Sequence, residues 1–96
     1  MELKNTASKE ATLLEKARSD YDAAICELMV AANRRFDLEA AREKGEPVDN
    51  EKYSRAKRAH VSATHKANDV FKLLLNECIS MEKALSRERI RAKQSQ

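Results

Sequence analysis

The chain has 96 residues, a formal net charge of +3 and 36% charged residues. This length suits one small domain, and a single glycine and a single proline are too few turn-formers for a sheet with several hairpins. The dominant residues, Ala, Leu, Glu, Lys and Arg, are strong helix formers, and aromatic residues make up only 4%. We therefore predict an all-α chain that has few bulky core residues and gains stability by association.

The first predicted helix covers about residues 6–44. Its apolar residues recur at steps of three or four, a spacing that lines one helix face. This stripe consists of Leu14, Ala17, Tyr21, Ile25, Leu28, Ala32, Phe36 and Ala40.

A turn is predicted at residues 45–49. Gly45 suits the left-handed position just past a helix end, and the ring of Pro47 cannot easily continue that helix. Asp49 can cap a second helix through its side chain. Val48 and Tyr53 then have the spacing of a hydrophobic staple.

The second predicted helix covers about residues 50–91 and is followed by a frayed tail at 92–96. Its stripe consists of Tyr53, Ala56, His60, Ala63, Ala67, Val70, Leu74, Cys78, Met81 and Leu85. A short loop between long helices makes them antiparallel neighbours. We therefore expect one helical-hairpin domain over residues 1–96.

In both helices, apolar side chains cover more of the helix circumference than one seam can bury, so a hairpin alone would leave some of them exposed. We expect dimerisation or a partner helix to complete a four-helix bundle. The predicted interface consists of Ile25, Met29, Val30, Val70, Phe71, Leu74, Leu75 and Ile79.

Basic residues gather in the second helix, which has no acid from residue 54 to 68. Near the C-terminus, cations also suit the helix dipole. The candidate basic surface, for phosphate or for an acidic protein, consists of Arg55, Arg58, Lys66, Arg87, Arg89 and Arg91.

No pattern indicates catalysis. Cys26 and Cys78 are too far apart in the predicted register for a disulfide, and we interpret both as small core residues. His60 and His65 lack the four-residue spacing of helix-borne metal ligands, although His60 could form a hydrogen bond across the seam. We predict no enzymatic activity, no catalytic or metal site, no cofactor and no small-molecule substrate.

The start of the chain is polar, and no apolar run approaches the roughly 20 residues of a membrane span. We therefore expect a cytoplasmic protein without a membrane partner.

The turn resembles that of a known family. Gly45, the Pro-Val-Asp run at 47–49, Tyr53 and the alanines that follow are similar to the small helical-hairpin co-chaperones of type III secretion needle subunits. The resemblance covers about residues 24–80 and implies a hairpin that packs against a partner chaperone in the bacterial cytosol. Small phage-encoded helical proteins, including inhibitors of host complexes, look equally similar. No functional residue is carried over.

These observations predict a small protein–protein interaction module of chaperone, adaptor or inhibitor type, either dimeric or bound to a protein partner. The alternative is a nucleic-acid-associated accessory protein that uses the basic surface.

Overall fold

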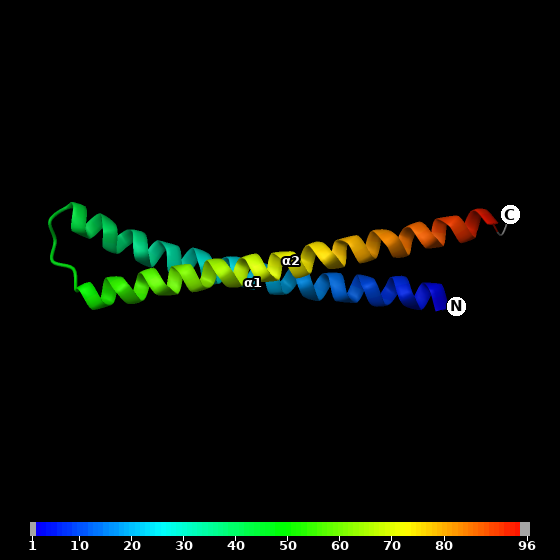
Figure 1. Cartoon of the computed structure of the whole chain (residues 1–96), viewed down its shortest axis with the longest axis horizontal. Coiled ribbons are helices and arrows are strands. Elements are labelled where there is room, and N and C mark those ends of the chain that lie inside the picture. Colours follow the sequence, from blue (N-terminus) through cyan, green and yellow to red (C-terminus); the bar gives the residue numbers. More distant parts are fainter. Residues whose placement is uncertain (1, 95–96) are drawn as a thin grey trace. The chain divides into compact units, whose positions relative to one another are not determined.

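A computed structural model describes residues 2–94 of the chain and contains two helices, α1 (Glu2–Glu43) and α2 (Asn50–Gln94), which a short turn connects (Figure 1). No strand occurs in this range, so the prediction of an all-α chain with two long helices is confirmed. Both helices are longer at their outer ends than predicted. In particular, residues 92–94 of the predicted frayed tail are helical, whereas residues 95–96 lie outside the described range.

The turn is closed by hydrogen bonds at both helix ends. Gly45 has a φ of 77° and donates its N–H to Arg42 at 3.0 Å, and Glu46 donates to Ala41 at 3.0 Å. This pair of bonds is a Schellman motif, which satisfies carbonyls that the helix end leaves open. At the start of α2, the Asp49 carboxylate accepts the N–H of Glu51 at 3.0 Å, so Asp49 is the N-cap.

We expect Gly45→Ala to lower the free energy of unfolding by about 1–2 kcal/mol, the cost of a left-handed conformation for a residue with a Cβ. Nothing lies within 4 Å of a Cβ built at this position, so backbone strain is the only penalty. Gly45→Asn should cost less, because asparagine tolerates this conformation. Urea unfolding followed by circular dichroism checks the order. Equal stability of all three proteins would contradict it.

The chain divides into two compact units, which are described separately. Unit 1 combines Met1–Tyr21 with Val70–Gln96, and unit 2 is Asp22–Asp69. Within unit 2, α1 and α2 run antiparallel, because Glu27 pairs with Lys66 and Glu39 bonds to Tyr53. Within unit 1, the rings of Tyr21 and Phe71 lie 5.6 Å apart between centroids.

The seam between the helices follows a heptad pattern. Buried and half-buried residues recur every 3.5 residues on average, as in a coiled coil. In α1 the residues on this repeat are Glu10, Leu14, Ala17, Tyr21, Ala24, Leu28, Ala31, Arg35 and Leu38. In α2 they are Tyr53, Ala56, His60, Ala63, Ala67, Val70, Leu74, Glu77, Met81, Ala84 and Glu88. A few residues beside the repeat are also half-buried: Ala11, Ile25, Ala32, Glu39, Ala41 and Ser80.

Alanine forms the most buried part of each seam. The buried apolar residues of the described range are Ala17, Ala24, Ala56, Ala67 and Ala84, and no large side chain in that range is fully buried. Small residues let two helices approach closely. The same residues bury little apolar area, however, so each seam contributes little hydrophobic stabilisation.

The predicted stripes are wrong toward the ends of the helices. Phe36 and Ala40 in α1, and Cys78 and Leu85 in α2, are exposed. The predicted α1 stripe advanced by nearly four residues per step, whereas a two-helix seam advances by about 3.5. The later residues of the predicted α1 stripe therefore lie outside the seam.

Carboxylates occupy seam positions in unit 1. One oxygen of Glu10 and one of Glu77 are buried without a hydrogen-bond partner among the described residues. A buried polar atom that lacks a partner lowers stability. The unit 1 seam is therefore a weak source of stability for the unit.

Candidate interaction surfaces

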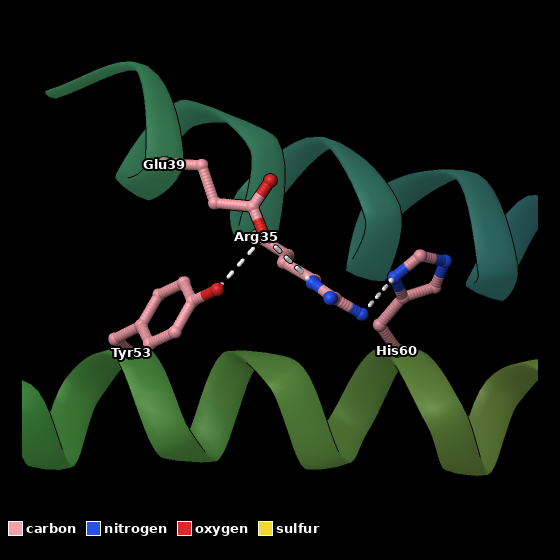
Figure 2. A network of polar contacts seen from close by, with 4 residues as sticks. All are labelled: Arg35, Glu39, Tyr53 and His60. Carbon is pink, nitrogen blue, oxygen red and sulfur yellow. Dashed lines mark hydrogen bonds and ion pairs between the residues drawn. The ribbon is translucent and has the colours of Figure 1, made fainter. Parts of the chain in front are cut away.

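A polar cluster crosses the seam of unit 2 (Figure 2). The Glu39 carboxylate accepts hydrogen bonds from Arg35 Nε at 3.0 Å and from the Tyr53 hydroxyl at 2.8 Å. Arg35 Nη1 also lies 3.4 Å from His60 Nδ1. A guanidinium has only donors, so Nδ1 is the acceptor in a hydrogen bond between these two groups. His60 thus makes the cross-seam contact that the sequence suggested.

Aromatic contacts flank this cluster. The rings of His60 and Phe36 meet edge to face, with centroids 5.6 Å apart and planes at 83°. The guanidinium carbon of Arg42 lies 4.1 Å from the Tyr53 ring centroid, in cation–π geometry. Near the turn, the two helices of unit 2 are thus joined by specific aromatic and cation–π contacts as well as by apolar packing. Sequence reasoning missed Arg35, although its place in the 3.5-residue repeat would have indicated it.

The cluster favours the ionised form of Glu39. Hydrogen bonds from Tyr53 first, and from Arg35 second, hold the pKa of the Glu39 carboxyl below its ordinary value of 4.5. A carboxyl whose pKa is lower in the folded state stabilises that state above its ordinary pKa. This stabilisation is lost as the pH falls below about 4.5 and through the folded pKa.

We expect Tyr53→Phe to weaken the acid dependence of stability, because it removes the larger cause of the Glu39 shift. The urea midpoints of the wild type and the variant should differ most near neutral pH and approach each other as the pH falls below about 4.5. Other carboxyls titrate in both proteins and cancel in the difference. A constant difference from pH 7 to pH 3 would contradict the assigned role of Tyr53.

The predicted interface residues of α1 lie in unit 2. Met29 and Val30 are 59% and 62% exposed, whereas Ile25 is half-buried. Val30 also lines a shallow groove between the two helices of this unit, together with Cys26, Glu27, Ala31, Arg34 and Ala59. The groove walls are mostly apolar, with Glu27 and Arg34 at the rim.

The predicted interface residues of α2 lie in unit 1. Phe71, Leu75 and Ile79 are 47%, 49% and 42% exposed. Leu73, which was not predicted, is 61% exposed, whereas Val70 and Leu74 are half-buried at the seam. Phe71, Leu75 and Ile79 follow one another at steps of four residues and so lie on one side of α2, and such clustering is typical of an interaction site, whereas Leu73 lies on another side.

The predicted basic residues are divided between the units. In unit 2, Arg55 pairs with Glu51 at 2.7 Å and Lys66 with Glu27 at 3.0 Å. Arg58 lines a shallow groove with Lys57, Val61, Ser62 and His65. In unit 1, Arg87, Arg89 and Arg91 are exposed on the last turns of α2.

Both cysteines are free thiols on the surface, so the prediction that they are core residues is wrong. In residues 8–94, whose side chains are described, no group of three or more His, Cys, Asp or Glu residues could hold a metal ion. Neither helix, over its described length, has an apolar segment that could cross a bilayer.

Comparison with protein families, with characterised proteins and with solved structures found no match. The resemblance to secretion co-chaperones therefore stays a prediction.

Proposed function

We propose that the chain is a small non-enzymatic protein–protein interaction module that binds its partner through exposed apolar side chains. The observation that carries this proposal is the α2 cluster in unit 1, where Phe71, Leu75 and Ile79 lie on one side of the helix and are all at least 42% exposed. Fully burying each such side chain contributes roughly 1.5–3 kcal/mol. A protein surface that covers several of them therefore gains substantial binding energy.

The absence of large, fully buried side chains among the described residues supports the same function. Each seam buries mainly alanine, so the large apolar residues of α2 are available to a partner instead of stabilising the hairpin. Chaperones, adaptors and inhibitors all present helical surfaces of this kind. We propose the cytoplasm as the compartment, since two free surface thiols suit a reducing environment.

A second candidate function is binding to the phosphates of a nucleic acid. It is favoured by the groove that Lys57, Arg58 and His65 line on α2. Within the described range, Lys57 and Arg58 form no ion pair that would neutralise them. No Phe, Tyr or Trp side chain lines this groove, so among its lining residues His65 alone offers a ring on which a base could stack.

Salt dependence of binding separates the two functions. A partner captured from cells that produce the chain should be purified and titrated with the chain at about 50 mM and about 200 mM salt, and a mobility-shift assay with DNA and RNA should be run at the same two concentrations. Binding through about six phosphates weakens by roughly a thousandfold over this range. We expect the protein complex to weaken far less and no nucleic acid to bind. Steep salt dependence with a shifted nucleic-acid band would overturn the proposed function.

A further inference from the structure

One side of α2 in unit 1 carries an exposed apolar stripe, which consists of Phe71, Leu75, Cys78 and Leu85. Their spacings of four, three and seven residues place them along one side of a helix. All four are exposed: Phe71, Leu75 and Leu85 are 47%, 49% and 38% exposed, and Cys78 is a surface thiol. Glu82 occupies the remaining position of this stripe and is also exposed.

The stripe lies beside the seam and not opposite it. At about 100° per residue, its positions are centred about 100° around the helix from the seam positions. In a four-helix bundle, each helix contacts two neighbours on sides about a quarter turn apart. The seam and the stripe of α2 therefore have the arrangement needed for one contact with α1 and one with a helix of another molecule.

The accessible surface of the chain is large enough to include an interface. The accessible surface is 7654 Å², whereas a compact monomer of 10.9 kDa exposes roughly 5,600 Å². The excess is about 2,000 Å², which is more than the roughly 800 Å² that each partner buries in a standard interface. The unpartnered carboxylate oxygens of Glu10 and Glu77 weaken the unit 1 seam, so this unit gains most from additional apolar burial.

We propose that the stripe is covered by the same stripe of a second copy of this chain, with the two α2 helices antiparallel. This inference rests on the proposed function and takes a second copy of the chain as one partner of the exposed apolar side chains. Phe71 and Leu85 are each seven residues from Cys78, so a twofold axis at Cys78 places Phe71 against Leu85 of the second copy, Cys78 against its own equivalent, and Leu75 close to Glu82. The antiparallel arrangement also keeps Glu82 away from its own equivalent, a like-charge contact that a parallel pair would force.

The first test is the mass of the purified chain by light scattering over a range of concentrations. We expect a species of twice 10.9 kDa. Leu75→Asp should raise the dimer dissociation constant by about thirtyfold or more, the effect of losing a central interface residue. The matched control is Leu73→Asp, because Leu73 is 61% exposed and lies about 200° around the helix from Leu75. It should leave the dimer intact.

The second test is oxidative cross-linking of variants that each retain one cysteine. Cys26→Ser, which keeps Cys78, should form a covalent dimer at low protein concentration. Cys78→Ser, which keeps the equally solvent-exposed Cys26, should not. Leu85→Cys, combined with Cys26→Ser and Cys78→Ser, should also form no covalent dimer, since only a parallel pair brings position 85 against its own equivalent.

A single-chain mass at every concentration, equal effects of the two leucine variants, or cross-linking at position 85 would each overturn the second-copy inference. None of these results removes the proposed function, which depends on binding of a partner through Phe71 and is measured separately. A wild-type chain that neither self-associates nor binds a protein partner would overturn both the inference and the proposed function.

Discussion

Ala24→Asp is expected to unfold unit 2 under conditions in which the wild-type chain is folded. Ala24 is 1% exposed at the seam of this unit, and an aspartate there would be both oversized and without a partner for its charge. A buried charge that lacks a partner costs roughly 3–5 kcal/mol, which is comparable with the whole stability of many small domains. Far-UV circular dichroism as a function of urea should show a much lower midpoint and a weaker helical signal.

Ala23→Asp is the matched control, because Ala23 is exposed at the next position of α1. Both variants lose the same intrinsic helix propensity and gain the same charge. An exposed substitution of this kind usually changes stability by less than about 1 kcal/mol. Equal midpoints for the two variants would mean that the seam does not run through Ala24.

The turn could be predicted in detail because its residues act through local geometry. The left-handed conformation of Gly45 and the capping role of Asp49 require only the backbone around them, so the sequence contains all the necessary information. Both features are present in the structure. Two long helices on either side of the turn then follow from composition and spacing.

The exact seam could not be predicted, because alanines occur in adjacent pairs along α1. Ala23 with Ala24, and Ala31 with Ala32, fit either of two neighbouring stripes, and apolar spacing alone does not choose between them. The structure selects the 3.5-residue repeat, in which Arg35 lies at the seam and Phe36 does not. The hydrogen bonds of Arg35 to Glu39 and His60 offset the burial of its polar side chain.

The candidate site was predicted in part by a count of apolar residues. More large apolar residues occur near positions 70–79 than one seam can bury, and several of them are exposed as a result. The choice among them was less accurate, since Val70 and Leu74 face the seam whereas Leu73 is exposed. Which of these residues are exposed depends on how α2 is rotated about its own axis, and the position of the seam fixes that rotation.

Phe71→Asp is the variant that we expect to affect partner binding most. Phe71 is 47% exposed at the start of the apolar stripe of α2, and a charge there would be left without a partner in the complex. The dissociation constant for the captured protein partner should rise by about thirtyfold or more. Phe71 also contacts the Tyr21 ring, so the urea midpoint of the variant must be measured to show that the chain remains folded.

Asn76→Asp is the control, because it adds the same charge at an exposed position of the same helix without removing an apolar side chain. The most direct measurement is a calorimetric titration of the wild type and these two variants with the purified partner. We predict a large loss of affinity for Phe71→Asp and an affinity for Asn76→Asp within about threefold of the wild type. Equal affinities for all three proteins would contradict a binding role for the exposed apolar side chains of α2.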